Sequence, residues 1–158
     1  MFMLLNVEKY LHDLEELVNT ESHSKMPEGT RNVAMLLKEK FDQLGWLTEI
    51  IDLGSQSGPC LKVLNKPSEK YDVMLLGHMD TVFPRGTVAA RPFKIVGGHY
   101  TGPGASDGNF TAALGIPTID GLGPIGGNAH SEREYGEIDS LAPRFELLYR
   151  LVNKLTQK

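Results

Sequence analysis

The run of apolar residues from Val73 to Leu76 limits more than any other feature what this chain can fold into. A strand that is apolar at every position is typical of a sheet buried on both faces, and helices cover such sheets. Amphipathic helix patterns flank the run, at residues 6–19 and 30–44 before it and at 141–155 after it. This alternation predicts an α/β fold, with a mixed, largely parallel sheet layered between helices.

Shorter patterns place the remaining elements. Strands are expected at 46–52, 60–64 and 72–77, because each is apolar or alternating and is bounded by turn residues. We also expect a strand pair at 93–95 and 99–101, a short helix at 109–114 and a buried strand at 116–119. Thr30 is the expected N-cap of the second helix and Gly45 its expected end, and Pro143 is expected in the first turn of the last helix.

Composition and charge exclude several classes of protein. The chain has 158 residues, of which 41% are hydrophobic and 23% charged, so it suits one compact domain and not a disordered segment. No apolar run is long enough to span a membrane. A net charge of −4 with scattered basic residues speaks against nucleic-acid binding. The single cysteine, Cys60, and an amino end without a signal-peptide pattern predict a cytoplasmic protein.

A histidine and an aspartate follow the apolar run directly. Ligands of open α/β sheets gather at the carboxyl ends of strands, which is where His78 and Asp80 fall. Side chains two residues apart on an extended segment point the same way, so Asp80 can orient the His78 imidazole while His78 binds a metal. The alternative is a surface pair at the start of a loop.

Two glycine-rich segments carry further candidate ligands. Asp107 lies in residues 101–109, where the glycines permit close approach of the backbone, although it also suits the N-cap of the helix expected at 109–114. His130 ends residues 121–130, a loop that offers backbone N–H groups to an anion, or else a flexible loop with an incidental histidine. Two histidines and a carboxylate are the residue types of a hydrolytic zinc site.

These segments carry a family resemblance. Residues 77–84 resemble the first metal motif of the co-catalytic zinc hydrolases that include glutamate carboxypeptidase, acetylornithine deacetylase and succinyl-diaminopimelate desuccinylase. Residues 102–107 look like their second motif, whose aspartate bridges two zinc ions. Residues 106–115 and 127–131 are similar to the carboxy-terminal segment of the glutamate carboxypeptidase branch.

The resemblance implies roles for four residues. His78 would bind one zinc ion, His130 would bind the second ion, and Asp80 would orient His78. Asp107 would bridge the two ions, or would stand for the aspartate that opens the carboxy-terminal segment. The family reaction is hydrolysis of an amide next to a free carboxylate, in peptide-like or acyl-amino-acid substrates, by a metal-bound hydroxide.

Parts of the family pattern are absent. The family carries a Glu-Glu pair, which supplies the general base and a ligand, and an inserted lid domain; the one Glu-Glu here, Glu15-Glu16, lies in the first helix. The second and carboxy-terminal motifs are fused at 105–107, which predicts an internal deletion, so that residues 1–158 form a single partial catalytic domain. A general base contributes about 10²–10⁴ in rate.

We therefore predict a zinc metallopeptidase with little or no activity, which holds one zinc ion weakly or none. The alternative is an inactive, metal-free scaffold whose uncovered apolar faces make it a homo-oligomer.

Overall fold

The computed structural model describes residues 4–55, 57–101, 111 and 113–157, which form two compact units. The first unit takes its described residues from Met1–Glu15, Tyr71–His78 and Phe93–Lys158, and the second from Glu16–Lys70 and Met79–Pro92. Helix α1 (Val7–Val18) contributes to both units, since the division falls after Glu15. In the part of the chain that the structure describes, no helix is long and apolar enough to cross a membrane.

The second unit contains helix α2 (Pro27–Gln43), and residues at its two ends determine where it begins and ends. Pro27 occupies the first position, where its missing N–H leaves no hydrogen bond unmade. Beyond the last turn, Gly45 has a φ of 74°, and its N–H donates to the backbone carbonyl of Asp42. The N–H of Trp46 donates to the backbone carbonyl of Phe41. The rings of Phe41 and Trp46 lie 5.5 Å apart, so a Schellman motif with its apolar contact ends the helix. The end predicted at Gly45 is confirmed, but Thr30 lies buried inside the helix and is not its N-cap.

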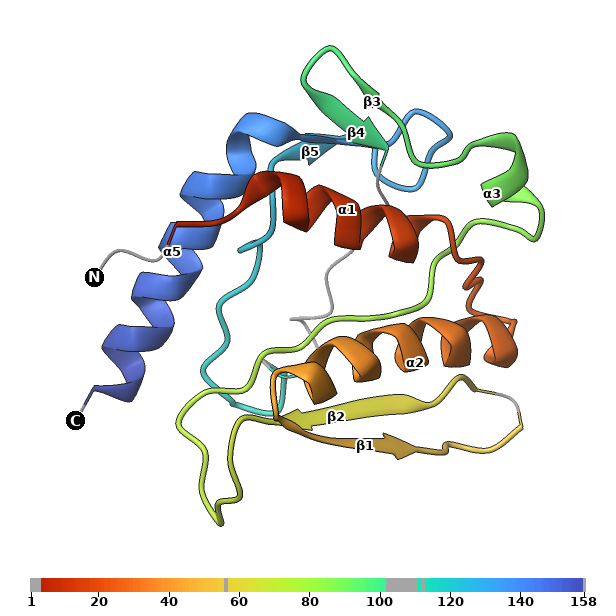
Figure 1. Cartoon of the computed structure of the whole chain (residues 1–158). Helices are drawn as coiled ribbons and strands as arrows, with labels where there is room; N and C mark the ends of the chain where they lie inside the picture. The colour runs from red at the N-terminus through yellow and green to blue at the C-terminus, as the bar shows by residue number, and fades with distance from the viewer. Residues whose placement is uncertain (1–3, 56, 102–110, 112, 158) are drawn as a thin grey trace. The chain divides into compact units, whose positions relative to one another are not determined.

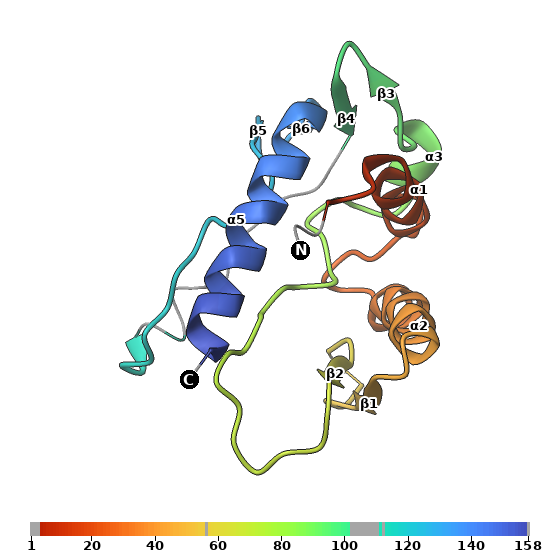
Figure 2. The same ribbon diagram turned by 60° about the vertical axis from the view of Figure 1, so that its left-hand side comes forward.

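A two-stranded antiparallel hairpin lies against α2 (Figures 1 and 2). Its strands are β1 (Leu47–Ile51) and β2 (Cys60–Leu64), paired from Leu47 opposite Leu64 to Ile51 opposite Cys60. Both strands were predicted. The hairpin packs against α2, which carries the buried Val33 and Ala34, and α3 (Thr87–Ala90) follows later in the same unit.

The first unit contains a four-stranded antiparallel sheet of order β3-β4-β6-β5, followed by a long helix. The elements are β3 (Ile95–Val96), β4 (His99–Thr101), β5 (Gly126–Gly127), β6 (Tyr135–Glu137) and α5 (Ile138–Thr156). The predicted strand pair is confirmed as β3 and β4, joined at Gly97 and Gly98, whose φ angles are 58° and 80°. Figure 2 shows α5 leaving the sheet directly after β6.

The core of this unit contains Tyr100 and Leu141, which are 7% and 2% exposed. The Tyr100 ring lies across Gly136 of β6, where a larger residue would leave it no room. Burial raises the pKa of Tyr100 above its ordinary value, and the neighbouring Tyr10 adds to the effect. Among the residues that the structure describes, few large side chains are buried, so each unit has a small core.

The mixed α/β character is confirmed, but the largely parallel sheet is not what the described residues form, because both sheets are antiparallel. Residues 72–77 and 116–119 are not strands. Met74, Leu75 and Leu76 are 64%, 66% and 60% exposed, so the run that should be most buried has no sheet around it. A strand needs neighbours that accept its backbone hydrogen bonds, and apolar sequence alone does not provide them.

Two further expectations are affected. The helix predicted at 109–114 lies largely outside the described residues. Helix α5 begins at Ile138 and not near Leu141, which moves Pro143 into the helix interior. There the proline removes one i to i−4 hydrogen bond from the second turn.

Candidate functional site

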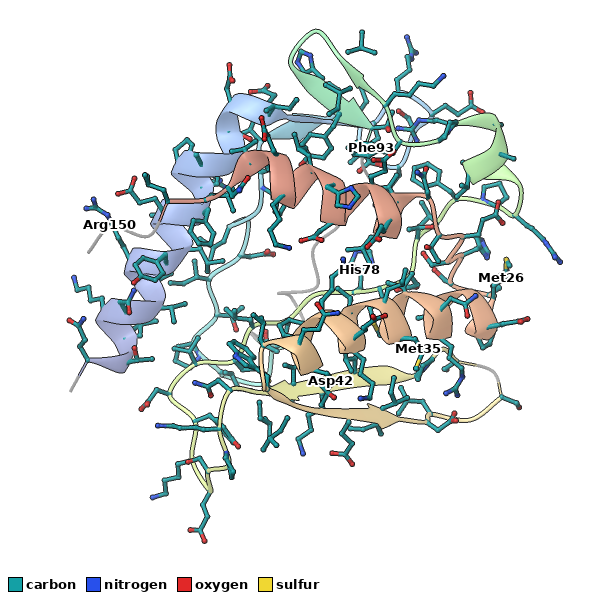
Figure 3. All side chains as sticks on the ribbon, viewed as in Figure 1. Met26, Met35, Asp42, His78, Phe93 and Arg150 are labelled. Carbon is teal, nitrogen blue, oxygen red and sulfur yellow. The ribbon has the colours of Figure 1, made fainter. Side chains whose placement is uncertain are left out.

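His78, labelled in Figure 3, ends the segment without helix or strand that follows residue 71. Its side chain is exposed. The preceding Gly77 has open space where a side chain would stand. The predicted buried strand is absent here, so His78 does not follow the carboxyl end of a strand.

Asp80 belongs to the second unit, where the backbone next to it is held firmly. The N–H of Thr81 donates to the carbonyl of Ser22 at 2.8 Å, and the N–H of Ser24 donates to the carbonyl of Thr81 at 2.9 Å. This short parallel pairing, centred on His23 and Thr81, fixes the backbone beside the half-buried Asp80. Since His78 falls in the first unit, the orienting role of Asp80 stays a prediction.

His130 lies in a tight loop, residues 128–134, that joins β5 to β6. The pairing of Gly127 with Tyr135 closes this loop at its base. Asn128 and His130 have φ angles of 55° and 63°, a left-handed conformation that non-glycine residues adopt only when their surroundings enforce it. The His130 side chain is exposed.

Hydrogen bonds within the loop enforce that conformation. Ser131 donates both its N–H and its hydroxyl to the carbonyl of Asn128, at 3.1 and 2.7 Å. The Asn128 amide donates to the carbonyl of Arg133 at 3.2 Å. The His130 N–H donates to Oε2 of Glu134 at 2.9 Å, and Glu134 is only 5% exposed. These hydrogen bonds give residues 128–134 a defined turn conformation.

Glu134 and Arg144 are residues of this region that sequence reasoning missed. The Arg144 guanidinium on α5 donates to the carbonyls of Gly121 and Gly123 and so ties the glycine-rich segment to the helix. Ser140 accepts the N–H of Ile125 at 2.9 Å and reinforces this attachment. Glu134 stands four residues after His130, but nothing in that spacing outside a helix shows that its carboxylate is buried. The predicted anion-binding role of the loop stays a prediction.

The chemistry of the predicted donors fits zinc, since two imidazoles and a carboxylate are common zinc ligands. His78 and His130 both belong to the first unit and are both exposed. Asp107 lies outside the described residues. Among the residues with described positions, no three His, Cys, Asp or Glu side chains gather closely enough to hold a metal ion.

Comparison with known proteins gives two positive results. The model of the family described as peptidase family M20/M25/M40 matches residues 98–154, which contain β4, the His130 loop, β6 and most of α5. Carboxypeptidase G2 of Pseudomonas sp. (strain RS-16) is 30% identical over 129 residues, or 81% of this chain and 30% of that protein. The chain therefore spans about a third of the length of this relative. No solved structure matches the chain significantly.

Proposed function

We propose that this chain is a shortened hydrolase of the metallopeptidase kind, of peptidase family M20/M25/M40, that retains two histidine-bearing segments. The observation that carries the proposal is the His130 loop, which lies inside the family match and presents its histidine on a tightly bonded turn. In this proposal residues 1–158 are a single partial catalytic domain joined near residue 106. Residues 72–77 then correspond to a strand of a layered sheet whose neighbours were removed. The lone Cys60 fits a cytoplasmic location.

The proposed metal ligands are His78, Asp107 and His130. A bound zinc ion would supply a polarised water for attack on an amide next to a free carboxylate. The chain has no Glu-Glu pair except Glu15-Glu16, which lies in α1, so the expected general base is missing. We therefore expect one weakly held zinc ion and little or no hydrolysis of peptide-like or acyl-amino-acid substrates.

Metal content is the direct test of this proposal. The native chain is purified in zinc and compared with His78→Ala and His130→Ala, with His12→Ala as the matched control because His12 is an exposed histidine on α1. Zinc should fall in the first two variants and stay unchanged in the control. Equal zinc in all four proteins would contradict the assignment, and rapid hydrolysis of an acyl-glutamate by the native chain would contradict the predicted loss of activity.

A second candidate function is a metal-free scaffold that self-associates, and the β1–β2 hairpin favours it. Thr48 faces α2, since its hydroxyl donates to Asp42. By alternation Leu47, Glu49 and Ile51 point to the opposite face. Leu47 and Ile51 are 48% and 37% exposed, although both are large apolar side chains.

Charge on this outer face suits a second copy of the chain. Glu49 lies opposite Lys62, with 3.4 Å between Oε2 and Nζ, and apolar pairs lie on either side of them. A two-fold axis parallel to the strands places Glu49 of one copy over Lys62 of the other, and Lys62 over Glu49. One hairpin face is smaller than the roughly 800 Å² per partner of stable complexes, so the dimer should form only at high concentration.

Charge reversal tests this dimer without relying on the bond inside one hairpin. Glu49→Lys and Lys62→Glu each break the internal pair and each place like charges across the two-fold axis, so each variant alone should sediment as a monomer. An equal mixture should associate, because one face is then entirely basic and the other entirely acidic. If the mixture stays monomeric while the native chain associates, the dimer uses another surface.

A further inference from the structure

A buried carboxylate is placed where it can control the candidate ligand His130. Glu134 is 5% exposed, and its Oε2 accepts the His130 N–H at 2.9 Å. Burying a carboxylate is unfavourable unless hydrogen bonds compensate it. The hydrogen bond that the His130 N–H donates is one of those that compensate the burial of the Glu134 carboxylate.

The backbone held in this way is in an unfavourable conformation. The φ of His130 is 63°, in the left-handed region where the Cβ of an L-residue is crowded. The N–H that Glu134 accepts is the one whose direction this φ sets. Because Glu134 accepts this N–H at 2.9 Å, the hydrogen bond favours this conformation over the extended alternatives.

Backbone hydrogen bonds hold Glu134 in place. Glu134 immediately precedes β6, whose residues pair with β4 on one side and β5 on the other. Its N–H donates to the carbonyl of Ser131 at 3.0 Å, which ties it to the same turn from the main chain as well. The carboxylate is thus fixed to the sheet, while the His130 ring it serves remains exposed.

We propose that Glu134 is a positioning residue that holds the main chain of His130 so that the imidazole is presented outward, ready to bind a divalent metal ion. This inference rests on the proposed function, in which His130 is a zinc ligand. Glu134 acts through the backbone and does not itself bind the metal. Groups that orient a ligand in this way typically change metal affinity by about 10–100-fold when they are removed.

The test compares Glu134→Ala and Glu134→Gln with the native chain, and uses Glu132→Ala as the matched control, since Glu132 is an exposed glutamate of the same loop. Hydrogen exchange of the His130 amide is measured by NMR without metal, and Zn²⁺ affinity by calorimetry. Glu134→Ala should exchange the His130 amide at least about tenfold faster and bind Zn²⁺ about 10–100-fold more weakly. Glu134→Gln keeps an oxygen acceptor and should restore most of both, and Glu132→Ala should change neither.

Each other outcome has a definite meaning. Unchanged exchange at His130 in Glu134→Ala, or faster exchange with native Zn²⁺ affinity, would overturn the inference. A Gln variant as defective as the Ala variant would also overturn it, because the effect would then not come from the accepted hydrogen bond. If His130→Ala binds Zn²⁺ as the native chain does, the proposed function fails first and the inference with it. Unaltered exchange of the β6 amides shows that each variant is folded.

Discussion

Gly58→Ala should destabilise the second unit because the space for a side chain is already filled by α2. Gly58 lies in the connection between β1 and β2. A Cβ at this position would lie 2.5 Å from Cβ, 2.6 Å from Cγ2 and 2.9 Å from Oγ1 of Thr30. Thr30 is 6% exposed and lies inside α2, so its Cβ cannot move unless the helix backbone moves with it.

The expected cost follows from these distances. Carbon atoms pack comfortably at about 3.5–4.0 Å, so the clash requires a shift of roughly 1 Å. Overpacking of this kind costs about 1–3 kcal/mol. Reduced freedom of the unfolded chain returns about 0.4–1 kcal/mol for a glycine to alanine change. Because Thr30 is β-branched and fixed to a helix, we expect a net loss near the upper end, about 2 kcal/mol. For a chain of this length that lowers Tm by about 4–8 °C.

Thermal and urea unfolding followed by circular dichroism measure this loss. Gly123→Ala is the matched control, because no atom lies within 4 Å of its added Cβ, and it should be as stable as the native chain. Thr30→Ala removes two of the three clashing atoms but keeps Cβ, so Gly58→Ala should cost less in that background and least in Thr30→Gly. If Gly58→Ala matches the native stability, or costs the same in all three backgrounds, the steric argument is refuted.

Three further substitutions test other parts of the fold. Leu141→Ala should lower the free energy of unfolding by about 2–5 kcal/mol, because Leu141 is 2% exposed. Leu147→Ala, at a 47% exposed position of the same helix, should lower it far less. Urea unfolding compares the two variants, and equal losses would contradict the assignment of Leu141 to the core. Pro143→Ala should raise stability by up to about 3 kcal/mol, because it restores a helix N–H, and a loss in the same assay would show that the proline is favoured by its packing. Hydrogen bonding to Lys38 is the main cause that holds the pKa of Asp42 below its ordinary value. The pair therefore stabilises the fold at pH values above the ordinary pKa of aspartate, and this stabilisation is lost as the pH falls through the lowered pKa. Asp42→Asn should therefore flatten the acid limb of a stability–pH profile, and an unchanged profile would contradict that role.

Local chemistry made several elements predictable from the sequence. Gly45 ends α2 because a left-handed residue there satisfies the last carbonyls, and Gly97-Gly98 joins β3 to β4 because a tight hairpin needs two positive φ angles. Both depend on a few consecutive residues. The beginning of α2 was harder, because Thr30 and Pro27 are both good initiators and only the packed helix shows which one begins it.

In the candidate site, too, some residues could be identified from the sequence and others only from the structure. The sequence pointed to His78 and His130 as metal ligands because one follows an apolar run and the other ends a glycine-rich segment. It did not reveal Glu134, since the burial of a carboxylate depends on how β5, β6 and the loop between them close. Arg144 is similar, because an arginine on a helix gives no sign of the carbonyls it will meet some twenty residues earlier in the chain.

The apolar run at Val73–Leu76 shows most clearly what each level decides. The sequence by itself determined that these side chains favour burial and that helices and short strands surround them. It could not determine that they would form a strand, because a strand exists only through hydrogen bonds to neighbours that other parts of the chain must supply. Within the described residues, the strands pair with one another and not with this run, as β1 with β2 and as β3, β4, β6 and β5 together. Met74, Leu75 and Leu76 of the run are therefore exposed, because the propensity of a segment is local whereas the pairing of strands is not.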